Sequence, residues 1–178
     1  MILGLAPMDW FTDCAFRQIA KEIFEKYGEK DKYDFHLWTE FMNADGYMIN
    51  PPGVIRHLMT TKEQSPVIAQ IFSGNEEMLL KCVTDIEHKY GKLFSWIELN
   101  MGCPARCVMN NGWGSALLKN RRESLSIIKN IRAVIALPFS VKTRMGLDEQ
   151  DREEQLTFLV EVSRYVDMIT IHGRTVKQ

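Results

Sequence analysis

The sequence predicts an α/β protein of the (β/α)8 barrel type that is incomplete, with about six of the eight β/α units present. Three observations support this prediction. Short apolar runs alternate with longer segments of helical periodicity, which is typical of parallel β/α architecture. A polar or reactive residue follows each apolar run. No glycine-rich fingerprint follows the first run, which disfavours a dinucleotide-binding Rossmann fold.

The predicted strands are apolar runs whose length suits buried strands. They cover residues 2–6, 35–39, 67–71, 96–99, 139–142 and 168–171. The chain stops just after the sixth run, and no internal repeat or low-complexity linker interrupts the pattern. We therefore expect residues 1–178 to form one barrel domain that is cut near Gln178.

Four helices are expected between these runs, each from an apolar stripe at helical spacing. The first helix has Thr12 or Asp13 as its N-cap and Gly28 at its end. The second helix starts near Asn75. The four expected stripes are Phe16, Ile19, Ala20, Ile23, Phe24 and Tyr27; Met78, Cys82, Val83 and Ile86; Leu125, Ile128, Ile131 and Ile135; and, from about Asp151, Leu156, Leu159, Val160 and Ser163. Residues 40–65 are less regular, with a turn at 50–53 and one short helix at 54–59.

The composition excludes several classes of protein. Hydrophobic residues make up 46% and charged residues 25%, as in a globular domain, and no apolar run is long enough to span a membrane. The net charge of −1 means that any RNA contact must come from a local basic patch or another domain. The N-terminus lacks a secretory signal, so we expect reduced cysteines and a cytoplasmic location. Cys103 and Cys107 have no matching second pair, so no metal site is expected.

Chemistry in β/α barrels gathers at the carboxyl ends of the strands. The polar residues there are Pro7-Met8, Thr39-Glu40, Gln70, Asn100 with Cys103, Lys142 with Arg144, and His172 with Arg174. Each has an ordinary structural interpretation: Cys103 could be a small buried residue, Gln70 could bond to backbone, and Lys142 could pair with Glu40. A ligand phosphate or an electron-rich ring is the functional alternative for Lys142. Basic residues at 119, 121 and 122 could contact RNA or simply begin a solvated helix.

Several motifs together resemble the tRNA-dihydrouridine synthases. "LAPMDWFTDCAFR" is similar to the family's first-strand pattern PM-x-G-x-T-D-x-x-F-R, and "NMGCPARCVMNNGWGSALL" is similar to its N-x-G-C-P and G-x-G-(A/S)-x-L-L signature. "VKTRMG" and "IHGRT" match two further motifs in the correct order, and the resemblance extends over essentially the whole chain. Asp9-Trp10 departs from the small residue and glycine that usually follow PM.

The resemblance implies an FMN-dependent oxidoreductase that reduces the C5–C6 double bond of uridines in tRNA, with NADPH as reductant. Cys103 would donate a proton to C5, since a thiol of ordinary pKa stays mostly protonated at neutral pH. Arg144 and Arg174 would contact RNA, and Asn100 would position the base. The residues expected to contact the flavin are Pro7, Met8, Asp9, Gln70, Lys142 and His172.

The resemblance also implies two further strands that hold the flavin phosphate and a C-terminal helical domain that binds tRNA, and neither is present. We therefore expect this chain alone to bind FMN weakly. Two alternatives stay open: an FMN barrel acting on a free pyrimidine, like dihydroorotate dehydrogenase, and a non-catalytic barrel fragment whose sheet edges invite pairing.

Overall fold

One curved parallel sheet organises the computed structural model, which describes residues 1–178. The sheet path runs β1-β2-β4-β5-β6-β7, and the short β3 pairs with β4 beside this path. The strands are β1 (Ile2–Leu5), β2 (Asp34–Trp38), β3 (Met42–Asn43), β4 (Val67–Phe72), β5 (Trp96–Met101), β6 (Phe139–Arg144) and β7 (Met168–His172). All six runs expected to be strands are therefore strands.

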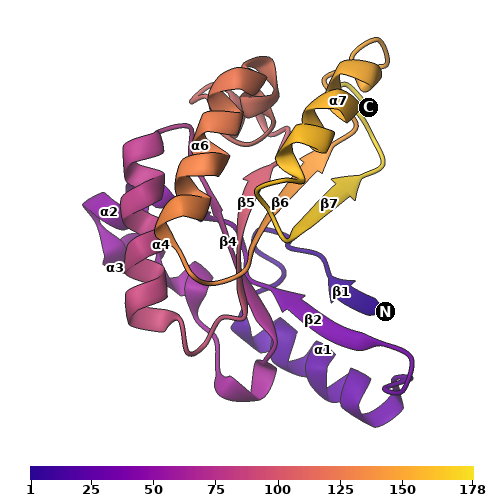
Figure 1. The fold of residues 1–178 in the computed structure, drawn as a ribbon. Coiled ribbons are helices and arrows are strands. Elements are labelled where there is room, and N and C mark those ends of the chain that lie inside the picture. Colours follow the sequence, from indigo (N-terminus) through magenta and orange to yellow (C-terminus); the bar gives the residue numbers. More distant parts are fainter.

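The sheet curls into a half-barrel, which confirms the predicted fold class. Every strand pair is parallel, and β1 and β7 form the two ends of the path. Residues from both of these strands nevertheless line the same cavity, which requires the sheet to bend around it. Figure 1 shows this bend, with helices α4, α6 and α7 on the outer side of the sheet.

The longer helices connect successive strands, as β/α alternation predicts. The α-helices are α1 (Cys14–Tyr27), α2 (Ala44–Ile49), α3 (Pro51–Val54), α4 (Glu76–Tyr90), α5 (Arg106–Met109), α6 (Arg121–Val134) and α7 (Arg152–Val162). Three 3-10 helices join them: η1 (Ile55–Leu58), η2 (Lys62–Gln64) and η3 (Gly114–Lys119). None of these helices combines the length and apolar character that crossing a bilayer would require.

The N-cap residues of α1 and α4 agree with the prediction from the sequence. Asp13 caps α1 by accepting a hydrogen bond from the Phe16 backbone N–H at 2.8 Å, and Asn75 caps α4. Between β2 and β4, the single short helix expected at 54–59 is instead split between α3 and η1. The proline pair at the start of α3 suits a first helical turn, where the missing N–H groups cost nothing.

The main core lies between the strands and helices α4 and α6. Residues such as Ile97, Leu99 and Val141 of the sheet pack against Ile86 and Ile128 of these helices within one buried cluster. The expected stripes of α4 and α6 mostly face this cluster. Burying such side chains contributes roughly 1.5–3 kcal/mol each, which makes this cluster the main source of stability.

The expected apolar stripe of α1 is largely exposed. Ile19 and Ile23 are more than half exposed, whereas Phe24 stacks on Phe35 of β2 with ring centroids 4.5 Å apart. The physical reason is position: α1 packs beside the β1 end of the sheet, where no further helix covers its outer side. Arg17 is the only fully buried residue of this helix.

The expected stripe of α7 is wrong in phase. Of the expected residues only Leu159 is buried, whereas Leu156, Val160 and Ser163 are exposed; Phe158 and Val162 complete the buried face. Gln155 explains the rotation, because its buried amide donates hydrogen bonds to the Thr143 hydroxyl and to the Arg144 carbonyl at the end of β6. A polar anchor therefore sets the face that α7 turns to the sheet.

Candidate active site

The carboxyl ends of the strands bring the predicted site residues to one rim. Asn100 on β5 lies opposite Lys142 on β6, and Arg144 lies opposite His172 on β7. Gln70 on β4 lies opposite Glu98 on β5. In parallel strands these positions share one edge of the sheet, which is where barrel enzymes carry their chemistry.

A hydrogen-bond chain joins Glu98, Gln70 and Asn100 inside the sheet. The Gln70 amide Nε2 donates to Glu98 Oε1 at 2.6 Å, and Asn100 Nδ2 donates to Gln70 Oε1 at 2.9 Å. Gln70 and Glu98 are fully buried, and Asn100 is nearly so. The two contacts fix which way the Gln70 amide points. Gln70 therefore acts on the rim through Asn100 in this structure.

The loop that carries Cys103 is held from both sides. Asn100 Oδ1 accepts hydrogen bonds from the backbone N–H groups of Gly102 and Cys103, both at 3.0 Å. The Cys103 carbonyl accepts from the backbone N–H and the hydroxyl of Ser115 at 3.0 and 2.9 Å. Gly114 has a φ of +59°, and a Cβ there would lie 2.8 Å from the Cys103 carbonyl oxygen. Glycine is thus required for this close approach.

The Cys103 thiol is half-buried in a mixed electrostatic environment. Burial raises its pKa, a hydrogen bond from the Ala105 backbone N–H opposes the rise, and Arg144 and Asp9 act in opposite directions. The net rise keeps the sulfur protonated at neutral pH, which suits a proton donor. Cys107, four residues on, is exposed, and all four cysteines are free thiols.

Lys142 is a half-buried cation without a direct partner. Burial lowers the pKa of its ammonium group, and the Glu98 carboxyl opposes this change. No hydrogen bond or ion pair joins the Lys142 Nζ to another group. Lys142 and Pro7 line an open cavity of about 410 Å³ inside the curled sheet, whose other lining comes mainly from β1 and β7; Cys103, Asn100 and Gln70 do not line it. An ammonium group placed in this way favours an anionic or electron-rich ligand.

The pairing of Lys142 with Glu40 does not occur. Glu40 Oε1 accepts a hydrogen bond from the Trp10 backbone N–H at 2.7 Å, and its other oxygen lies 3.7 Å from His57 Nδ1. Glu40 follows β2, whereas Lys142 lies three places along the sheet on β6. Glu98, on the strand next to Lys142, supplies the nearby negative charge instead.

Three basic residues lie at the ends of β6 and β7 but differ in their contacts. Arg144 Nε donates to the Gly102 carbonyl at 2.7 Å, and its Nη1 donates to the Thr175 carbonyl at 2.9 Å. Arg144 thereby ties the cysteine loop to the segment after β7. The side chains of His172 and Arg174 are exposed and make no hydrogen bond, so they stay available for an anion.

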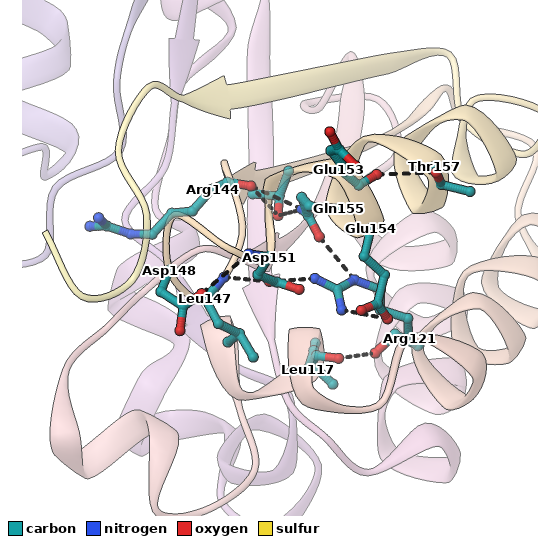
Figure 2. Close-up of polar contacts among 12 residues, drawn as sticks. Leu117, Arg121, Arg144, Leu147, Asp148, Asp151, Glu153, Glu154, Gln155 and Thr157 are labelled. Atoms are coloured by element: carbon teal, nitrogen blue, oxygen red, sulfur yellow. Dashed lines mark hydrogen bonds and ion pairs between the residues drawn. The ribbon is translucent and has the colours of Figure 1, made fainter.

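A second hydrogen-bond network joins the backbone of Arg144 to helices α6 and α7. Figure 2 shows Arg121 reaching Gln155 through Nε at 3.2 Å and Asp151 through Nη2 at 2.6 Å, while Gln155 bonds to the Arg144 carbonyl. The Asp151 carboxylate also accepts from the Leu147 backbone N–H at 2.6 Å. Arg121, part of the basic cluster noted in the sequence, is therefore a structural residue.

The loop after β1 is closed by Thr12. Its hydroxyl accepts from the Met8 backbone N–H at 2.9 Å and donates to the Met8 carbonyl at 3.1 Å. Thr12 is fully buried, Pro7 is half-buried and Met8 is exposed. Asp9 lies close enough to influence the pKa of Cys103. The loop thus brings Pro7 to the cavity and Asp9 to the thiol.

Glu98 is the main site residue that sequence reasoning missed. It sits in the middle of the predicted strand 96–99, where every other residue is apolar. A carboxylate inside a buried strand is costly unless it is bonded, and that cost was the available signal. Ser140 also donates to Glu98 Oε2 at 3.1 Å, which completes its partners on the next strand.

Replacing Glu98 with glutamine is expected to change how stability depends on pH. Burial raises the pKa of Glu98 in the folded protein above its ordinary value of 4.5, so the folded state binds more protons than the unfolded state above pH 4.5. Wild-type stability is therefore fully present below pH 4.5 and decreases as pH rises through the folded-state pKa. Urea unfolding from pH 4.5 to 8 should show the Glu98→Gln variant gaining stability relative to wild type as pH rises. Parallel curves would contradict this expectation.

Comparison with protein-family models finds one match, to the dihydrouridine synthase family, over residues 4–178. A "probable tRNA-dihydrouridine synthase 2" from Bacillus subtilis is 33% identical over 96% of this chain and 49% of its own length. A "tRNA-dihydrouridine(20/20a) synthase" from Vibrio parahaemolyticus is 31% identical over 97% of this chain. A "probable tRNA-dihydrouridine synthase" from Staphylococcus aureus is 32% identical over 98%. The chain spans about half the length of these curated relatives.

Proposed function

The chain belongs to the dihydrouridine synthase family, and from this premise we propose that its protein reduces the C5–C6 double bond of uridines in tRNA. One observation beyond the family carries the proposal. The Cys103 thiol, kept protonated by burial, is fixed by Asn100 at the rim where Lys142 lies unpaired on the neighbouring strand. A proton donor beside a site for an electron-rich ring is what this reduction needs.

The residues fit a flavin at this rim. The half-buried Lys142 ammonium makes no bond within the protein, and Lys142 and Pro7 both line the open cavity inside the curled sheet. A positive charge there would stabilise the negative charge that develops on a flavin when it is reduced. We propose that FMN is held by Pro7, Met8, Asp9, Lys142 and His172, and that Gln70, whose amide is bonded to Glu98 and Asn100, supports the site through Asn100.

When bound, the reduced flavin supplies a hydride to C6 of the uracil ring, with NADPH as the source of electrons. The Cys103 S–H bond breaks as the new C5–H bond forms, so hydride and proton together add H2 across the double bond. The thiolate that remains takes a proton back from water. Asn100 holds the two backbone N–H groups of the loop, so the sulfur keeps its place while its charge changes.

RNA contacts are proposed for the basic groups of the same rim. His172 has its pKa lowered first by burial and then by Arg144, Lys142 and Arg174, which shows that these four groups lie close together. The positive charges of Arg144, Lys142 and Arg174 suit phosphates in a chain whose net charge is −1, and the neutral His172 ring adds a hydrogen-bonding group. Arg174 is free to bind a phosphate, and Asn100 lies where a base could be positioned. The free cysteines suit a cytoplasmic enzyme.

The test is reduction of an unmodified tRNA transcript by the protein with added FMN and NADPH. We expect mass spectrometry to find dihydrouridine, and no reduction of free uridine or orotate. Reduction of a free pyrimidine but not of tRNA would show that the protein belongs functionally with the free-pyrimidine enzymes. No product from either substrate, with flavin bound, would reject the proposal.

A further inference from the structure

We propose that Trp10, backed by Arg56, is a stacking platform for an unpaired base of the RNA substrate beside the reacting uridine. The proposal rests on the proposed function, because it assumes that RNA reaches this rim. It concerns residues that the mechanism above does not use. Trp10 stands at a position where the family pattern has glycine, so the platform is a feature of this chain.

Trp10 is exposed and adopts an unfavourable backbone conformation. Its side chain is 72% exposed, and its φ of +66° is the only positive φ at a non-glycine residue in the protein. Glycine would adopt this φ without strain, and a bulky residue does so rarely. Neither burial nor backbone preference therefore explains a tryptophan here. Its large, open aromatic ring is what remains to explain it.

The backbone under Trp10 is firmly anchored. Its N–H donates to Glu40 at 2.7 Å, and Glu40 is almost fully buried. Thr12 closes the same loop through its two bonds to Met8. The ring is thus displayed from a fixed loop, which reduces the entropy lost when a ligand binds.

Arg56 holds the ring itself. Its guanidinium lies 4.2 Å from the centroid of the Trp10 ring, in a cation–π contact. Arg56 belongs to η1, so the contact joins the loop after β1 to the segment after α3. The guanidinium takes one face, and the high exposure of the ring leaves the rest open. A planar aromatic ligand can stack on the solvent-facing part of the Trp10 ring.

The platform lies near the proton donor. Trp10 follows β1 and Cys103 follows β5, so both lie at the carboxyl edge of the parallel sheet. Side-chain atoms of Asp9, Glu40 and His57 lie within 4.8 Å of one another beside Trp10, and Asp9 also influences the pKa of Cys103. Arg56 supplies a positive charge at the ring itself, and Lys142, Arg144 and Arg174 supply others at the ends of β6 and β7 on the same edge of the sheet. An aromatic surface among several cations fits a nucleic acid better than a protein partner.

An unpaired base is the part of RNA that fits. Both faces of a base in a duplex are covered by its neighbours, whereas a base next to an extruded nucleotide loses a stacking partner. A tryptophan ring can replace that partner without reading the sequence, because every base has an aromatic face. The platform would therefore help keep the uridine out of its stack.

The test measures binding of an unmodified tRNA transcript and of a fully paired RNA duplex to the wild type and to Trp10→Gly. Glycine suits the positive φ, so the variant should fold and show a melting temperature no lower than wild type. We expect affinity for tRNA to fall on the order of tenfold, as for loss of one stacked base, and affinity for the duplex to stay the same. Trp10→Phe should retain part of the affinity.

Tyr27 provides a matched control. It is 73% exposed, with the Lys26 ammonium 5.0 Å from its ring centroid, but it ends α1, which leads into the amino end of β2, so it lies at the edge of the sheet away from the rim. Tyr27→Ala should leave tRNA binding unchanged. Equal tRNA affinity of wild type and Trp10→Gly would overturn the platform, and so would an equal loss for the duplex or for Tyr27→Ala. A wild type that binds and reduces tRNA in such a case leaves the proposed function standing. Absence of any wild-type product on tRNA would reject the function itself.

Discussion

Replacing Cys103 with alanine is expected to slow dihydrouridine formation by about two to four orders of magnitude, the usual contribution of a general acid. Burial raises the pKa of this thiol, which keeps it protonated, and its loop is held by Asn100 on the strand next to Lys142. FMN binding should survive, because the bonds that hold this loop come from the backbone of Cys103 rather than from its sulfur. Single-turnover reduction of tRNA by the flavin-loaded protein, followed by mass spectrometry, measures the effect.

Cys107→Ala is the control for this experiment. Cys107 lies in the same loop region but is exposed, and its thiol bonds to nothing. This variant should keep wild-type activity, which separates the chemistry of one thiol from a general disturbance of the loop. Wild-type turnover by Cys103→Ala would remove Cys103 from the mechanism. Because burial raises the pKa of Cys103, loss of activity through ionisation of this thiol should begin only above the ordinary thiol value of about 9.

The strands and the rim could be predicted because each depends on a local signal. Apolar runs of strand length gave all six long strands, and parallel pairing then placed the residues that follow them at one edge. The spatial relation of Asn100 to Lys142 required no more than this register. The apolar pattern of the sequence was sufficient to predict those strands and helices whose position depends on burial in the core.

The incorrect predictions concern a helix face and an ion pair that depend on polar contacts between distant segments of the chain. The phase of α7 follows from Gln155, whose partners lie at the end of β6, and periodicity alone ranked Leu156 above it. Charge alone pairs Glu40 with Lys142, although Glu40 instead accepts a hydrogen bond from the Trp10 backbone N–H. A short strand such as β3 and the turns around it carry too few residues for any periodicity.

Arg17 shows how far such a polar contact can matter for stability. Replacing Arg17 with methionine is expected to lower the free energy of unfolding by about 3 kcal/mol, because buried acceptors that lose their donor cost roughly 1–3 kcal/mol each. Arg17 is 1% exposed, and burial lowers its pKa. Its guanidinium donates to the Thr12 carbonyl at 2.5 Å, to Gln64 Oε1 at 3.3 Å and to the Met59 carbonyl. Methionine fills much of the volume but satisfies none of these oxygens.

Urea unfolding and thermal melting measure this loss, which corresponds to a decrease on the order of 10 °C in melting temperature for a domain of this size. Arg17→Lys retains the charge but not the planar fork, so it should lose a similar amount. Arg152→Met is the surface control, since Arg152 pairs only with Glu149 in solvent and should change stability by less than about 1 kcal/mol. If Arg17→Met were as stable as that control, the guanidinium would not be what joins the loop after β1 to the segment around Gln64. In that case the Glu40 and Thr12 contacts alone would hold the loop that carries Asp9 and Trp10.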